Sequence, residues 1–568
     1  MPPYVVRVST CSLNQWALDF EGNYARVSAS IARAKASGSR FRTGPELELT
    51  GYGCEDHFYE SDTQFHAWGS LSRLIQDGSS DGFLIDVGMP VLHGGVRYNA
   101  RVFCLDRRIV LVRPKMSLAE DGNYREGRWF SPWRESRGLE SVQLPPELRG
   151  VLAGGQACAP MGVALLRLGD AVLGAETCEE LFTPHPPHIR AALAGVDIVC
   201  NGSGSHHQLR KLHTRVDLMR NASLTCGITY LYANQRGCDG GRLYYDGCAM
   251  IMACGELLVQ GAQFGLKDCE VLTASVDLEP GRSALAAQPS AGRQGSEEPP
   301  MPFIALPDYF LKQPLSSSHH SSHCHAAPPP SRPIRVHYWS PEEEIGRGPA
   351  CWLWDFLRRS GARGFFLPLS GGADSAATAT IVGVMANMVM EALRGEEEGW
   401  GGGSSSSSSS GAETRTVLED VRRITGDSEF TPRTPRELVA RIFHTSYMGT
   451  SQNSSHATRA RAAALAAQLG AQHTSPSIDA LVSAFLWVLA FFITGGRMPR
   501  FSASGGCTVE DLALQNLQAR IRMVLAYFLA QLLPWLGGGK GFLLVLGSAN
   551  VDESLRGYMT KYDCACVC

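Results

Sequence analysis

A glycine- and hydroxyl-rich segment, residues 369–375 (LSGGADS), has the composition of a phosphate-binding loop. It follows a strand-like apolar run and precedes a helical pattern over residues 376–393. Adjacent glycines let backbone N–H groups approach a polyphosphate without a Cβ clash, and a helix N-terminus favours bound anions. Ser370 and Ser375 add hydroxyl donors, and Asp374 suits a site in which Mg²⁺ lies between it and the phosphates. The segment lacks the Walker A pattern, and an ordinary turn before a helix is the alternative interpretation.

A second set of reactive residues lies in the first half of the chain. Glu46, Lys115 and Cys178 each stand at or just beyond the end of a strand-like run, where α/β enzymes gather their sites. Glu46 could take the proton of the Cys178 thiol, and Lys115 could lower the thiol pKa and stabilise an oxyanion. Considered singly, each residue also has an ordinary interpretation as a capping carboxylate, a solvated cation or an inert buried thiol.

The 369–375 loop resembles the SGGxDS pyrophosphate loop of ATP-pyrophosphatases, which cleave ATP between its α- and β-phosphates. Together with residues 447–461, 516–523 and 547–563 it resembles the ammonia-using domain of NAD synthetases. This resemblance implies that Asp374 and Glu553 bind Mg²⁺, that Ser370 is catalytic and that Arg520 lies near deamido-NAD. The residues that it places on ATP are Pro368, Leu369, Ser370, Gly371, Gly372, Ala373, Asp374, Ser375, Arg459 and Thr560.

The Glu46, Lys115 and Cys178 set resembles the catalytic residues of the nitrilase (carbon–nitrogen hydrolase) superfamily. Longer segments are similar to the glutaminase half of eukaryotic glutamine-dependent NAD synthetases, among them residues 11–23, 44–58, 113–126, 176–188, 202–218, 233–251 and 340–360. The resemblance therefore covers nearly the whole chain. It further implies that the residues positioning glutamine include Tyr124, Glu126, Ser205 and Arg210.

The two resemblances imply one reaction. Glutamine is hydrolysed at Cys178, and the released ammonia converts an adenylated deamido-NAD into NAD, the last step of NAD biosynthesis, with release of AMP and pyrophosphate. ATP is the co-substrate and Mg²⁺ the metal ion, and the substrates are glutamine, deamido-NAD and ATP. Free ammonia is mostly protonated at neutral pH, so the resemblance also implies an internal tunnel between the two sites and a homo-oligomer.

The sequence departs from the family pattern after residues 560–563 (TKYD). Relatives continue with further polar segments that complete the dinucleotide site, whereas here the chain ends in CACVC. We therefore expect a truncated synthetase domain. Two alternatives stay open, a glutaminase or amidase only, and a regulatory subunit that assembles with a complete relative. The three terminal cysteines lack the further ligands that a thiolate metal site needs.

Composition divides the chain into two structured blocks. For residues 1–278 the resemblance implies a four-layer α-β-β-α nitrilase domain. For residues 334–568 it implies a doubly wound, parallel-sheet ATP-pyrophosphatase domain, which the placement of residues 369–375 between a strand and a helix also predicts. Residues 279–333, rich in Pro, Ser, Gly, Ala and His, predict a low-complexity linker. A Gly/Ser-rich segment, residues 395–411, predicts a surface insertion in the second domain.

Overall charge and cysteine usage narrow the class of protein. Lys+Arg 52 against Asp+Glu 55 leaves a net charge of −3, which argues against a nucleic-acid or anionic-membrane binder. The 17 cysteines are scattered, no secretory signal precedes them, and reduced thiols in the cytoplasm are expected. The most apolar run, residues 480–494, is too short for a membrane span of about 20 residues and predicts a buried helix.

Overall fold

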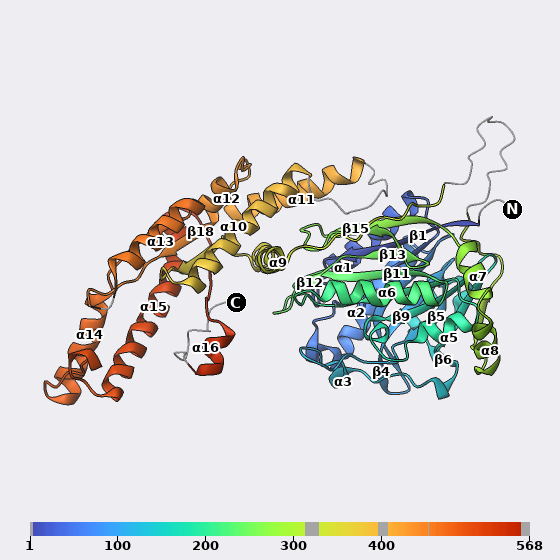
Figure 1. The fold of residues 1–568 in the computed structure, drawn as a ribbon, viewed down its shortest axis with the longest axis horizontal. Helices are drawn as coiled ribbons and strands as arrows, with labels where there is room; N and C mark the ends of the chain where they lie inside the picture. Colours follow the sequence, from blue (N-terminus) through green and yellow to red (C-terminus); the bar gives the residue numbers. More distant parts are fainter. Residues whose placement is uncertain (1–3, 313–328, 396–406, 453, 558–568) are drawn as a thin grey trace. The chain divides into compact units, whose positions relative to one another are not determined.

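A computed structural model of the chain describes residues 4–312, 329–395, 407–452 and 454–557 (Figure 1). The chain divides into two compact units. Unit 1 comprises residues 1–348 and 397–407, and unit 2 comprises residues 349–396 and 408–568. The boundary between them falls inside helix α9 (Pro341–Ser360).

Unit 1 is built on a mixed sheet with the strand order β16-β8-β9-β10-β11-β1-β2-β3-β4-β5-β7-β6. Neighbouring strands from β9 to β3 run parallel, and β3, β4 and β5 continue as antiparallel neighbours. The strands are β1 (Val5–Leu13), β2 (Phe41–Thr43), β3 (Leu84–His93), β4 (Val96–Leu105), β5 (Arg108–Pro114), β6 (Glu140–Gln143), β7 (Cys158–Met161), β8 (Leu165–Leu168), β9 (Val172–Thr177), β10 (Ile198–Ser203), β11 (Thr229–Gly237), β12 (Tyr245–Asp246), β13 (Met250–Ala253), β14 (Glu256–Gln260), β15 (Cys269–Asp277) and β16 (Phe303–Leu306).

Three separate apolar clusters show that unit 1 has four layers. One cluster joins α1 (Phe20–Ala36) and α2 (Ser61–Gln76) to the sheet, through residues such as Ile31 and Leu71. A second cluster joins strand side chains mainly to one another, for example Val8 to Leu173 and Leu231. The third joins α5 (Pro187–Leu193) and α6 (Lys211–Thr225) to the opposite sheet face. Because the strand residues alternate between clusters, two sheet layers lie between two helix layers.

Part of the predicted linker is structured. Residues 279–306 form α7 (Glu279–Ala286), α8 (Pro289–Glu297) and β16, and β16 pairs in parallel with β8. Composition alone does not reveal these elements. Helix α8 contains no buried residue, and its helix-forming residues are Ala, Gln and Arg. Residues 313–328, which include the His-rich run, lie outside the described residues.

Unit 2 contains a parallel sheet with the order β19-β18-β17-β20. After β19 the chain returns to the other side of β17, so the direction of winding reverses between β17 and β20. Ile521 and Ala530 of α15 pack against Phe366 and Val545 of this sheet. The elements are β17 (Phe365–Pro368), α10 (Ala373–Arg394), α11 (Ser407–Thr425), α12 (Pro435–Ile442), β18 (Phe443–Ser446), α13 (His456–Leu469), β19 (Gln472–Thr474), α14 (Asp479–Leu489), α15 (Thr508–Leu536), β20 (Leu544–Val545) and α16 (Val551–Arg556).

The helix predicted over residues 480–494 forms, but the prediction that it is buried is wrong. Helix α14 has no buried residue, and the π-helical turn Ala490–Thr494 that continues it buries only Ala490. Phe491, Phe492 and Ile493 are 66–73% exposed. Apolarity alone cannot distinguish a face that packs inside the unit from a face that stays open. Among the described helices, α10 is long and apolar enough to cross a membrane, and 44% of its apolar window is buried.

Candidate active sites

The first site is built around the ammonium group of Lys115. Its Nζ donates to Glu46 Oε1 at 2.6 Å and to Glu126 Oε1 at 2.8 Å, and all three side chains are buried. Lys115 directly follows β5, whereas Glu46 lies in the turn after β2. The sheet therefore brings together carboxylates and a cation that are far apart in sequence.

Further hydrogen-bond donors bind the carboxylate oxygens of Glu46 and Glu126. Asn99 Nδ2 donates to Glu46 Oε1 at 2.6 Å, and the Gly204 N–H donates to Glu46 Oε2 at 3.1 Å. Tyr52 donates its hydroxyl to Glu126 Oε1, and the Ala119 N–H donates to Glu126 Oε2 at 3.2 Å. Buried charges need such donors because water is not available to solvate them.

Burial and neighbouring charges set the protonation states here. Burial alone would lower the pKa of Lys115, but the carboxylates of Glu126 and Glu46 outweigh it and raise that pKa. Burial raises the pKa of Glu126 to about 7, against the lowering effect of Lys115. Burial also raises the pKa of the Cys178 thiol, helped by the Glu46 charge and opposed by Lys115. The resting thiol is therefore protonated at neutral pH and needs a base.

Cys178 stands where β9 ends and a short 3₁₀ helix, Cys178–Leu181, begins. Its φ is +40°, which is uncommon for any residue except glycine, and its side chain is buried. The two N–H groups at this corner are fixed by side chains. Thr177 N–H donates to Glu180 at 2.7 Å, and Cys178 N–H donates to Asn201 Oδ1 at 2.9 Å. The charges of Glu46, Lys115 and Glu126 all act on the thiol, so the predicted set shares one site.

The residues predicted to position glutamine fall into different places. The Tyr124 hydroxyl donates to the Gly204 carbonyl and accepts from the His206 N–H, and burial raises the pKa of this tyrosine. Within the described residues the buried Ser205 hydroxyl has no hydrogen-bond partner, which leaves it available to a ligand. Glu126 instead binds Lys115.

Arg210 turns away from Cys178. It is the left-handed residue before α6, and its side chain donates to the Trp339 carbonyl at 2.7 Å and to Glu344 at 3.1 Å. Lys211, the first residue of the helix, is half-buried, and its ammonium lies 5.6 Å from the Tyr124 ring. Burial lowers the pKa of Lys211. A half-buried cation there is a candidate for binding an anionic substrate group.

The second candidate site is the loop between β17 and α10. Gly371 has a φ of +75°, and a Cβ there would come within 2.2 Å of the Thr458 carbonyl oxygen, so only glycine fits. Ser370 and Ser375 bring their hydroxyl oxygens to 2.9 Å of each other, and Arg461 Nε donates to the Gly371 carbonyl. Pro368 ends β17, Leu369 N–H donates to Ser446, and α10 begins at Ala373 after Gly372.

Loops after β17 and β20 meet at the point where the winding reverses. Asn550 Nδ2 donates to Asp374 Oδ1 at 3.0 Å, and Asn550 Oδ1 accepts from the Glu553 N–H at the start of α16. Asp374 is exposed at the N-terminus of α10. A carboxylate such as that of Asp374 is a hard oxygen ligand of the kind that Mg²⁺ prefers. Among the described residues, no group of three or more His, Cys, Asp or Glu side chains is arranged to hold a metal ion.

Three further residues are predicted to contact ATP or deamido-NAD, namely Arg459, Arg520 and Thr560. The Arg459 guanidinium lies 5.5 Å from the ring of Tyr447 on the neighbouring segment, and Arg520 lies exposed on α15. Thr560 lies outside the described residues.

Comparison with known proteins decides the family. The carbon-nitrogen hydrolase model matches residues 7–284, and the NAD synthase model matches residues 425–567. The chain is 51% identical over 563 residues to the glutamine-dependent NAD(+) synthetase of Oryza sativa subsp. indica, covering 99% of this chain and 72% of the rice protein. The chain belongs to the glutamine-dependent NAD(+) synthetase family.

Other members of the glutamine-dependent NAD(+) synthetase family are similarly close. The human protein is 52% identical and the Saccharomyces cerevisiae protein 50%, each over 99% of this chain and 75% of the relative. A crystal structure of a glutamine-dependent NAD(+) synthetase from Cytophaga hutchinsonii superposes with a TM-score of 0.71 at 23% identity, over 98% of this chain and 76% of that one. The predicted family and fold class are confirmed.

Sequence reasoning missed three groups in this NAD(+) synthetase family member. Asn201 and Asn550 carry no signal of their own because asparagine is common in turns. Lys211 directly follows Arg210, and the sequence does not show that Arg210 binds Glu344 and the Trp339 carbonyl whereas Lys211 lies beside the Tyr124 ring.

Replacing Lys115 by methionine leaves Glu46 and Glu126 buried without their shared cation, at a cost of about 3–5 kcal/mol. Losing the cation removes the group that lowers the Glu126 pKa, so this pKa rises further in the folded state, and the folded variant binds a proton that the unfolded chain has released. Its free energy of unfolding should therefore fall further below wild type as the pH rises from about 5 to 8. Denaturant titration measures this, with the exposed Lys540→Met as control. A deficit that does not change with pH would contradict the ion-pair geometry.

Proposed function

We propose that this chain makes NAD from deamido-NAD, with glutamine as the nitrogen donor and ATP as the energy source. The observation that carries the proposal is the buried Lys115 ammonium between Glu46 and Glu126 beside Cys178, in a chain that matches glutamine-dependent NAD(+) synthetases over 99% of its length. The loop at residues 369–375 supports the second half of the reaction.

In the first half, Glu46 takes the proton of the Cys178 thiol as the sulfur attacks the side-chain amide carbon of glutamine. Lys115 stabilises the negative charge that develops on the carbonyl oxygen. The C–N bond breaks, the leaving nitrogen takes up a proton, and ammonia departs from a γ-glutamyl thioester on Cys178. Water then adds to the thioester, which releases glutamate and restores the thiol.

In the second half, the nicotinate carboxylate of deamido-NAD displaces pyrophosphate from the α-phosphate of ATP. The N–H groups at the start of α10 and the hydroxyls of Ser370 and Ser375 would contact the phosphates. Asp374 and Glu553 are the residues that would bind Mg²⁺, which neutralises charge on pyrophosphate when bound. Ammonia then attacks the adenylated carboxyl carbon, and AMP leaves as NAD forms.

Cys178→Ala removes the nucleophile but leaves unit 2 unchanged. With glutamine as nitrogen source, NAD formation from deamido-NAD and ATP should fall at least about 1,000-fold. With ammonium chloride it should stay near the wild-type rate, because no thioester is needed. Liquid chromatography of NAD measures both.

The same assay separates the alternatives for this chain. Wild-type chain that releases glutamate but makes no NAD from either nitrogen source would be a glutaminase only. Chain that does neither would be a regulatory subunit. Either result contradicts the proposal.

We also propose that the chain forms a homo-oligomer through the exposed apolar face of α14 and the turn that continues it. Phe485, Trp487, Phe491 and Phe492 are 55–68% exposed there, and residues 480–494 contain no charged side chain. Exposed apolar patches of this kind mark interaction sites, and an uncharged face suits a second copy of itself, as in obligate homodimers.

Phe491→Glu places a charge in this face and should shift the protein to a smaller species. Light scattering after size-exclusion chromatography measures the mass. Phe65→Glu is the matched control, because Phe65 of α2 is 60% exposed on unit 1 and should leave the mass unchanged. An identical mass for wild type and both variants would contradict this interface.

The cytoplasm is the proposed compartment. Several buried cysteines are free thiols, among them Cys11, Cys54, Cys104 and Cys200. Free thiols in this number suit a reducing environment. A tagged chain that fractionates with organelles would contradict this.

A further inference from the structure

A buried chain of hydrogen bonds leads from the backbone of Cys178 to the carboxylate of Glu176. Cys178 N–H donates to Asn201 Oδ1 at 2.9 Å, and Asn201 Nδ2 donates to the Tyr230 hydroxyl oxygen at 3.0 Å. Tyr230 in turn donates to Glu176 Oε2 at 2.7 Å. These residues lie on the neighbouring strands β9, β10 and β11 and are at most 3% exposed.

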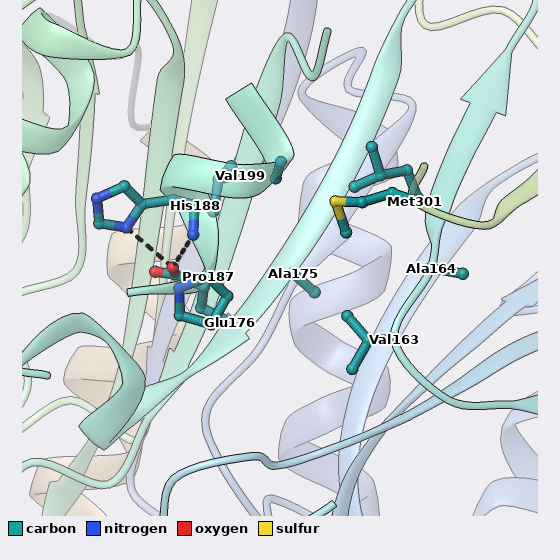
Figure 2. A pocket seen from close by; sticks show the side chains of 10 residues that line it. Val163, Ala164, Ala175, Glu176, Pro187, His188, Val199 and Met301 are labelled. Carbon is teal, nitrogen blue, oxygen red and sulfur yellow. Dashed lines mark hydrogen bonds and ion pairs between the residues drawn. The ribbon is translucent and has the colours of Figure 1, made fainter. Parts of the chain in front are cut away.

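His188 completes the chain at its far end. Its backbone N–H and its ring Nδ1 both donate to Glu176 Oε1, at 2.6 and 2.9 Å. Figure 2 shows the two side chains meeting at one side of a small pocket whose other labelled lining residues are apolar. Burial would raise the pKa of Glu176, but the charge and hydrogen bonds of His188 and the bond from Tyr230 outweigh it and lower that pKa.

The direction of every bond in this chain follows from Glu176. A carboxylate only accepts, so the Tyr230 hydroxyl must donate to it and can only accept from Asn201. Asn201 must then turn its NH₂ group toward Tyr230 and its oxygen toward the Cys178 N–H. With the opposite orientation, the Asn201 NH₂ and the Cys178 N–H, which are both donors, would face each other.

The corner at Cys178 needs such a constraint. A φ of +40° is a strained conformation for cysteine, and strained residues persist only where the surroundings over-determine them. Ser203 Oγ also donates to Asn201 Oδ1, at 2.8 Å, but it does not affect which way the amide points.

We propose that Glu176, acting through Tyr230 and Asn201, is a positioning residue that orients the Cys178 backbone, and with it the thiol, for attack on glutamine. This inference rests on the proposed role of Cys178 as nucleophile. It assigns a function in glutamine hydrolysis to a carboxylate that does not contact the substrate.

Tyr230→Phe in the full chain removes the oxygen that connects Asn201 to Glu176. Glutamate release per Cys178 thiol, counted by saturating labelling of the Cys178 peptide with a diazo-ketone analogue of glutamine that reacts only in a folded site, should fall about tenfold, because small misplacements of a reacting group are costly. The KM for glutamine should change less than about twofold, because contacts with bound substrate are unaltered. A loss of folded protein alone would lower the number of titrated thiols and not the rate per thiol.

Glu176→Gln is a second test that keeps the side-chain volume. Its oxygen stays with the two His188 donors, because an NH₂ there would face the backbone N–H, so its NH₂ group faces Tyr230. The chain of hydrogen bonds then reverses and points the Asn201 NH₂ at Cys178. The rate per thiol should again fall about tenfold. Ser203→Ala is the matched control, because it removes one bond to the same Asn201 oxygen without changing direction, and its rate should stay near wild type.

Outcomes for the two proposals are distinct. Wild-type chain that releases no glutamate would overturn the proposed function and this inference with it. Active wild type together with unchanged rates per thiol in Tyr230→Phe and Glu176→Gln would overturn this inference alone. An equal loss in Ser203→Ala would also overturn it, since the number of hydrogen bonds and not their direction would then matter. If Tyr230→Phe does not fold, Glu176→Gln decides.

Discussion

Burial of the Lys115 ammonium between two carboxylates is the constraint on which unit 1 depends. Removing three charges from water is costly, and the cost is offset only if each remaining donor and acceptor has a partner. The Asn99 amide, the Gly204 N–H and the Tyr52 hydroxyl supply those partners. They come from separate strands and loops, so the site exists only when the whole sheet has formed. The same charges act on Cys178, which links the stability of the core to the chemistry of the thiol.

The proposed site of unit 2 differs from that of unit 1 because its ligand, ATP, is a large anion. The parallel sheet places the ends of β17 and β20 side by side, and the reversal of winding between them leaves room for a ligand. Gly371 lets the loop approach Thr458 closely, while Asn550 connects Asp374 to the start of α16. Asp374 and Gly372 are exposed in this arrangement, in contrast to the buried site around Lys115.

The candidate residues of both sites could be named from sequence because of the family resemblance. Without it, a Gly-Gly pair before a helix is also an ordinary turn, and Glu46, Lys115 and Cys178 each have an ordinary interpretation. Orientation could not be predicted in the same way. Arg210 and Lys211 are adjacent cations, but Arg210 binds Glu344 and the Trp339 carbonyl, whereas the Lys211 ammonium lies beside the Tyr124 ring. Exposure of α14 and the pairing of β16 depend on what packs nearby, which residue composition does not encode.

Trapping the covalent intermediate tests the central claim most directly. The purified chain is mixed with glutamine, quenched with acid within one turnover, digested and examined by mass spectrometry. The account predicts a γ-glutamyl group on the peptide that contains Cys178, and a strong loss of that adduct in Glu46→Gln, which lacks the base. Glutamate release without an adduct on Cys178, or an adduct on a different cysteine, would contradict it.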